Sequence, residues 1–195
     1  MPGLRLKPVE PYGLAIFETA TYADDRGWFA ESFNEREFSE ALAAAGLPPA
    51  GRMVQDNHSR SAAGVVRGLH FQLPPHAQGK LVRVLSGAIF DAAVDIRANS
   101  PTFGQWFAIE LSASNRQQLW IPPGFAHGFQ VLGDVAEVFY KTTDYYAPAA
   151  ERSIAWHDPS IGIPWPDRAS AVLSGKDAQA PLLSEVRSDL LGISF

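Results

Sequence analysis

Apolar and polar residues alternate along much of the chain with a period of two. Between Ala88 and Ile96 the even-numbered positions are apolar, whereas Asp91, Asp95 and Arg97 occupy the odd ones. Phe107, Ile109 and Leu111 repeat the pattern. Successive side chains of a β-strand point to opposite faces, so this period is typical of strands. The pattern therefore predicts a chain built mainly from β-strands.

Clusters of turn-forming residues divide these runs. They are Ser86-Gly87, the segment 112–115, Pro122-Pro123-Gly124 and Gly133-Asp134. Short strands separated by regular turns indicate a β-sandwich or a barrel, and a double-sheet jelly roll fits the length and offers a concave interior for a ligand. The period alone leaves other β-sandwiches open.

One segment has the pattern of a helix instead. Asn34 with Glu37 three residues later resembles a capping box, and Phe38, Leu42 and Ala45 form an apolar stripe. Gly46 followed by Pro48 ends the segment. We expect one short helix here, packed on a sheet.

Composition narrows the class of protein. The 195 residues, 46 % of them hydrophobic, predict one globular domain spanning 1–195. The chain has 16 Lys and Arg against 21 Asp and Glu and no basic run, which argues against nucleic acid as a partner. No stretch approaches the ~20 apolar residues of a membrane span, and MPGLRLKPVEPYG lacks the apolar core of a signal peptide. With no Cys, a cytoplasmic location is expected.

Polar residues that suit chemistry gather in three segments, 55–59, 67–72 and 78–80. If 67–72 is a strand, Gly68, His70 and Gln72 share one face, and Arg67 shares the other with Leu69 and Phe71. An isolated histidine would most simply be a satisfied core residue. His70, however, lies near the cations Arg67 and Lys80, which suit a diphosphate or an oxygen that becomes negative during a reaction.

The chain resembles the dTDP-4-dehydrorhamnose 3,5-epimerase family over roughly residues 12 to 185. The blocks that carry the resemblance occur in the family's order, which makes them more specific than any single motif. They are DRGWFAESF (25–33), QDNHS (55–59), RGLHFQ (67–72), QGKLVR (78–83), VDIR (94–97), SPTFG (100–104), LWIPPGFAHGF (119–129), YKTTDYY (140–146) and SGKD (174–177).

The resemblance implies an all-β cupin jelly roll with a few short peripheral helices, a homodimer that needs no metal or other cofactor. It implies a dTDP-linked 4-keto-6-deoxyhexose as substrate, inverted at C3 and C5 to give dTDP-4-dehydro-L-rhamnose in deoxysugar biosynthesis. His70 matches the catalytic base, Asp177 its orienting carboxylate, Tyr140 the opposite proton donor and Lys80 the lysine near the keto oxygen. Tyr146 matches the aromatic residue that stacks on thymine. The other substrate-binding positions are Arg26, Glu31, Gln55, Asn57, Arg67, His127, Glu151 and Lys176.

The reaction itself requires such groups. Removing a proton beside a ketone requires a stabilised enolate oxygen, and loss of one such stabilising group typically costs ~3–4 kcal/mol. Inversion also needs a base with a pKa near the working pH and an acid on the other face. Lys80, His70 and Tyr140 are the candidates for these three roles.

Each candidate also has a structural interpretation. Tyr140 could be an ordinary strand tyrosine, and His127 could end a strand. His76 and His157 are interpreted as solvated and receive no role. Asp91, Asp95 and Arg97 are interpreted as the solvent face of a strand or an ion-pair network, and Asp24 and Asp25 as turn residues.

Other functions remain open. A metal-dependent cupin would need several imidazoles, and the sequence lacks the expected closely spaced histidine pair. A 3,4-ketoisomerase would share fold and substrate class, and an epimerase acting on one carbon would share the motifs. A sugar-binding module without activity would not need a base, an acid and a lysine.

Overall fold

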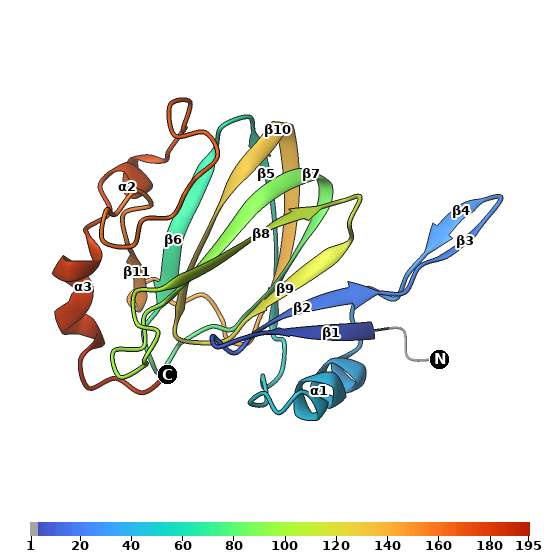
Figure 1. Cartoon of the computed structure of the whole chain (residues 1–195), viewed down its shortest axis with the longest axis horizontal. Helices are drawn as coiled ribbons and strands as arrows, with labels where there is room; N and C mark the ends of the chain where they lie inside the picture. The colour runs from blue at the N-terminus through green and yellow to red at the C-terminus, as the bar shows by residue number, and fades with distance from the viewer. Residues whose placement is uncertain (1–3) are drawn as a thin grey trace.

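Strands dominate a computed structural model of the chain, which describes residues 4–195 (Figure 1). The strands are β1 (Leu4–Val9), β2 (Leu14–Thr19), β3 (Tyr22–Asp24), β4 (Gly27–Phe29), β5 (Gln55–Ala62), β6 (Val66–Gln72), β7 (Lys80–Asp95), β8 (Trp106–Ser112), β9 (Gln117–Ile121), β10 (Phe125–Thr142) and β11 (Glu151–Ser153). The helices are α1 (Glu35–Ala44), α2 (Gly175–Ala178) and α3 (Leu183–Leu190). The predicted class, an all-β jelly roll of the cupin type with short peripheral helices, is confirmed.

Two long strands, β7 and β10, run through the whole body (Figure 1). They pair with each other along nearly their full length in antiparallel register. The second half of β7 also pairs with β8 and the first half of β10 with β6, while their other halves pair with β9 and β5. The two layers of the jelly roll therefore share β7 and β10.

Two of the predicted turns form and two do not, because β7 and β10 each continue from one layer into the other. The segments 112–115 and 122–124 connect β8 to β9 and β9 to β10, as predicted. Ser86-Gly87 and Gly133-Asp134 were wrong as strand ends, because each lies inside a continuous strand. Gly87 and Gly133 have φ values of 74° and 77°, and the β7–β10 register is irregular between Leu132 and Val138. The glycines thus mark the bend at which each strand passes from one layer to the other.

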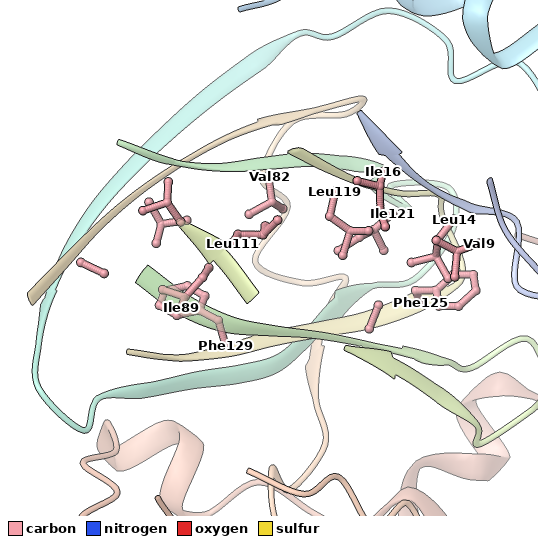
Figure 2. Packing of buried hydrophobic residues seen from close by; sticks show 14 of the residues in the cluster. Val9, Leu14, Ile16, Val82, Ile89, Leu111, Leu119, Ile121, Phe125 and Phe129 are labelled. Carbon is pink, nitrogen blue, oxygen red and sulfur yellow. The ribbon is translucent and has the colours of Figure 1, made fainter. Parts of the chain in front are cut away.

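The main apolar core lies between the two layers, as Figure 2 shows for Val82, Ile89, Leu119, Phe125 and Phe129. Its members come from β1, β2, β7, β8, β9 and β10. Burial of apolar side chains from so many strands ties the layers together.

The helices cover the outer faces of the layers. The predicted helix α1 forms, with the Asn34 side chain accepting from the backbone N–H groups of Arg36 and Glu37. Its buried residues Phe38 and Leu42 pack on Trp120 and neighbouring side chains of the sheet. Helix α3 and the segment before it cover the other layer. No helix within residues 4–195 is long and apolar enough to cross a membrane.

The acidic side of β7 was predicted to face solvent, and this was wrong. Asp91 and Asp95 are both fully buried, because one face of β7 lies under the α3 layer and the other faces the jelly-roll interior. The ion-pair alternative holds for Asp95, whose carboxylate accepts from Arg97 at 2.6 Å and from Ser100 and Thr102.

Candidate active site

The structure contains a polar cleft of about 300 Å³. It brings together the three polar segments of the sequence, which lie on or next to β5, β6 and β7, with residues from β10 and β11. Its lining residues are Gln55, Asn57, His70, Phe71, Gln72, Gln78, Lys80, Tyr140, Tyr146 and Glu151.

Strand β6 forms as predicted, but its side chains do not alternate regularly. His70 lies opposite His127 and Arg67 opposite Phe129, so two residues of β6 face the single residue Gly128 of β10. This bulge brings Arg67 to the face of His70, whereas strict alternation would have separated them. A side-chain carbon on Gly68 would lie 2.5 Å from Cα of Gly128, so the close approach requires glycine.

His70 is paired with a buried carboxylate from the far end of the chain. Its Nε2 lies 2.5 Å from Oδ1 of Asp177, a residue 107 positions away that is 4 % exposed. Ser174 donates to the other carboxylate oxygen at 2.9 Å. Burial opposes the charge of Asp177, but the hydrogen bond and charge of His70 outweigh it and lower its pKa. An ionised carboxylate held this way orients the imidazole and fixes its tautomer.

Lys80 is buried on the floor of the cleft. Its Nζ donates to the backbone oxygen of His70 at 3.3 Å. Burial lowers the pKa of Lys80 to about 8, against the attraction of the carboxylates of Asp91 and Glu151. At neutral pH the lysine is therefore mostly in its charged form. A buried ammonium suits a group that stabilises negative charge during a reaction.

His127 lies behind these residues as part of a second histidine–carboxylate pair. Its Nε2 lies 2.8 Å from Oδ1 of Asp91, and both residues are buried. Burial lowers the pKa of His127 despite the Asp91 carboxylate. His127 is not among the residues that line the cleft, so the structure places this predicted binding residue behind its wall.

Tyr140 comes from the half of β10 that pairs with β5, whereas His70 comes from the opposite layer. Burial raises the pKa of Tyr140, with a smaller opposing effect of Arg67 and a further increase from Glu151. The phenol stays protonated over the neutral range and is therefore able to donate a proton.

The mouth of the cleft is linked by hydrogen bonds. Tyr146 donates its hydroxyl to Oε2 of Glu151 at 2.8 Å, and Nζ of Lys176 lies 2.6 Å from Oε1 of the same carboxylate. Gln55 accepts from the backbone N–H of Tyr146 and donates to Asn57, both at 3.0 Å. These five predicted residues are thus connected. Arg67, Lys176 and Asp177 line a neighbouring pocket that shares His70 with the cleft.

Arg26 and Glu31 lie outside both pockets. Arg26 lies on the β3–β4 hairpin, which projects away from the body of the jelly roll (Figure 1). Its side chain is 90 % exposed and pairs with Asp24 at 2.6 Å. Asp24 also accepts from the backbone N–H of Arg26, in agreement with its interpretation as a turn residue. Glu31 accepts from Asn34 at the start of α1.

Two residues without a predicted role, Gln72 and Asp91, also belong to the surroundings of the site. Gln72 is buried and joins the loops on either side of the cleft, donating to the backbone oxygens of His76 and Tyr145 and accepting from Ala147. Asp91 could have been found from Ile89 and Ala93 on its own face, a sign of a buried environment. Among residues 4–195 no cluster of three His, Cys, Asp or Glu side chains is arranged to hold a metal ion.

The sequence matches the profile of the dTDP-4-dehydrorhamnose 3,5-epimerase family over residues 9–185. It is 53 % identical over 173 residues to the dTDP-4-dehydrorhamnose 3,5-epimerase of Salmonella typhimurium, covering 87 % of this chain and 90 % of the relative.

Two solved structures are similar over nearly their whole length. The dTDP-6-deoxy-D-glucose-3,5-epimerase RmlC of Legionella pneumophila, in complex with dTDP-4-keto-L-rhamnose, has a TM-score of 0.91 at 47 % identity, covering 98 % of this chain and 99 % of that one. ChmJ, a 3′-monoepimerase from Streptomyces bikiniensis in complex with dTDP-quinovose, has a TM-score of 0.85 at 33 % identity, covering 94 % and 91 %.

Proposed function

Because the chain belongs to the dTDP-4-dehydrorhamnose 3,5-epimerase family of isomerases, we propose that it inverts C3 and C5 of dTDP-4-dehydro-6-deoxy-D-glucose. The product is dTDP-4-dehydro-L-rhamnose, a precursor for deoxysugar biosynthesis. The observation that carries this proposal is the His70–Asp177 pair at 2.5 Å beside a buried lysine in one cleft.

Each inversion is a proton transfer through an enolate. His70 removes the proton from the carbon beside the C4 ketone, and the electrons of that bond move to the ketone oxygen. The Lys80 ammonium stabilises the oxygen, and removal of one such group from an enzyme typically costs ~3–4 kcal/mol of transition-state stabilisation. Tyr140 then donates a proton to the opposite face of the carbon. The sugar keeps its formula, and the enzyme is restored when His70 releases its proton to solvent and the Tyr140 phenolate takes one from it.

Four other residues, Arg67, Tyr146, Gln55 and Asn57, are proposed to bind the nucleotide. Arg67 is suited to the diphosphate because a guanidinium can bind phosphate oxygens through two hydrogen bonds. Tyr146, 54 % exposed at the mouth, is suited to stack on thymine. Gln55 and Asn57 lie beside it on β5. His127, behind the wall, supports the floor of the cleft through Asp91.

Arg26 and Glu31 fit this proposal only if a second copy of the chain is present. Arg26 lies on the β3–β4 hairpin and Glu31 follows it. The hairpin projects from the body and exposes Tyr22, Trp28 and Phe29 by 54 %, 60 % and 69 %. Large exposed aromatic side chains on a projecting segment favour burial against a partner. We therefore propose a homodimer in which each hairpin serves the partner's cleft.

A single domain over 1–195 and a cytoplasmic location stay predictions. The single domain is supported by β7, which contributes residues to all three apolar clusters of the described chain.

Solvent deuterium tests the proposed reaction. The protein is incubated with dTDP-4-keto-6-deoxyglucose in deuterated water, without a downstream reductase, and NMR locates the deuterium and the configuration. Deuterium at both C3 and C5 with inversion is expected. Labelling of one carbon would instead favour a monoepimerase, an alternative suggested by the similarity to ChmJ. A migrated carbonyl would indicate a 3,4-ketoisomerase, and complete absence of exchange would indicate a binding module.

A further inference from the structure

Both carboxylate oxygens of Glu151 are already bound to other side chains of the protein. Lys176 occupies Oε1 at 2.6 Å and the Tyr146 hydroxyl occupies Oε2 at 2.8 Å. Burial opposes the charge of Glu151, but these two partners outweigh it and lower its pKa. A carboxylate oxygen accepts from more than one donor, so Glu151 keeps these two contacts while a substrate binds. Substrate binding, the role implied by family resemblance, does not by itself explain why the carboxylate joins two side chains of the protein.

The two partners of Glu151 belong to different parts of the cleft. Tyr146 lies in the loop between β10 and β11, where the nucleotide is proposed to bind. Lys176 lies in α2, a helix of only four residues, immediately before Asp177. Asp177 in turn holds the proposed base, His70. Glu151 itself is fixed in β11, where it pairs with Gln72 of β6.

We propose that Glu151 is a positioning residue that couples occupation of Tyr146 by a nucleotide base to the orientation of the His70–Asp177 pair. The inference rests on the proposed function. A base stacked on Tyr146 restricts its ring, the Tyr146 hydroxyl then fixes the Glu151 carboxylate, and that carboxylate fixes Lys176 and with it α2. Coupling of this kind requires a continuous set of contacts between two sites, which these residues provide.

A double-mutant cycle on the two ends tests the coupling. Tyr146→Phe keeps the stacking ring but deletes the hydroxyl, and Lys176→Met keeps the side-chain length but deletes the charge. The readouts are the rate of deuterium exchange at saturating substrate and the dissociation constant of dTDP. We expect each single change to slow exchange roughly 3- to 10-fold, the effect of losing one hydrogen bond. Tyr146→Phe should leave the dTDP dissociation constant within about 3-fold of the parent because the ring is retained.

Non-additivity is the decisive result. Because either change interrupts the same connection, the double variant should exchange no more slowly than the slower single variant. Glu151→Gln, which keeps an acceptor for Tyr146 but loses the ion pair, should behave like Lys176→Met. Glu137→Gln is the matched control, because Glu137 also binds two basic side chains, His58 and Arg60, but lies outside the cleft. It should retain the parent rate.

Two outcomes would overturn the coupling alone while the parent protein exchanges normally. One is that the single effects multiply in the double variant, and the other is that Tyr146→Phe keeps the parent exchange rate. A parent protein without any exchange would overturn both the coupling and the proposed function.

Discussion

Replacing Lys80 by methionine should slow catalysis roughly 10²- to 10³-fold and at the same time stabilise the fold. Burial lowers the pKa of this lysine from its ordinary 10.5 to about 8. That difference corresponds to about 3 kcal/mol by which the charged lysine disfavours the folded state at neutral pH. Methionine fills a similar volume without a charge. Part of the gain is offset because the hydrogen bond from Nζ to the backbone oxygen of His70 is lost, so we expect a net increase of about 1–3 kcal/mol in unfolding free energy.

The dependence on pH gives the sharper test. Between pH 8 and 10.5 the unfolded chain holds a proton on Lys80 that the folded protein has lost, so this group makes stability rise with pH across that window. The advantage of Lys80→Met should therefore shrink by about 2 kcal/mol between pH 7 and pH 9.5. Urea unfolding of both proteins at the two pH values measures it, with Lys141→Met as the control because Lys141 pairs with the exposed Asp56.

Activity should follow the same titration. Because the charged lysine is the form that stabilises the enolate oxygen, deuterium exchange by the parent protein should fall as pH rises through about 8. The reasoning would be refuted if Lys80→Met were less stable than the parent at pH 7, or if its advantage were equal at pH 7 and 9.5.

Three further predictions concern the base, the bulge and the assembly. His70→Asn should remove nearly all exchange at both carbons with little change in dTDP binding, and substantial exchange by this variant would refute the role of His70. His157→Asn, a change in an exposed loop residue, should keep the parent exchange rate. Gly68→Ala should lower the unfolding free energy by about 2–5 kcal/mol, because the added carbon meets the backbone of Gly128. Gly133→Ala, at a positive φ with open space around it, should lower it by only about 1–2 kcal/mol, and equal losses would contradict the close approach to Gly128. Light scattering at micromolar concentration should give twice the 21.2 kDa of one chain, and a monomer mass would contradict the homodimer.

Local patterns in the sequence predicted those parts of the fold that local interactions determine. The cap at Asn34, the stripe of α1 and the turns at 112–115 and 122–124 depend on neighbouring residues, and all of them form. Ser86-Gly87 and Gly133-Asp134 have the same local signature as a turn. Whether such a glycine reverses a strand or bends it depends on pairing with strands distant in sequence, which the local pattern does not contain.

The same limit applies to the site. The polar segments predicted where the cleft lies, but alternation separated Arg67 from His70 because the bulge opposite Gly128 is set by the pairing with β10. The contact of His70 with Asp177 spans 107 positions and was implied only by family resemblance. An acidic residue on a strand usually faces water, which favours a solvent position for Asp91, whereas its burial follows from β7 being covered on both faces.

The ratio of exchange to inversion in Tyr140→Phe tests most directly the claim that two residues act on opposite faces of the sugar. Proton removal needs only the base and the stabilised enolate, whereas inversion also needs a donor on the other face. Phenylalanine keeps the ring and its packing on the apolar core but deletes the hydroxyl. In deuterated water we expect deuterium at C3 or C5 with retained configuration, because His70 returns a solvent-derived proton to the face it left. Inversion by Tyr140→Phe at close to the parent rate would show that another group is the donor, and would contradict the account.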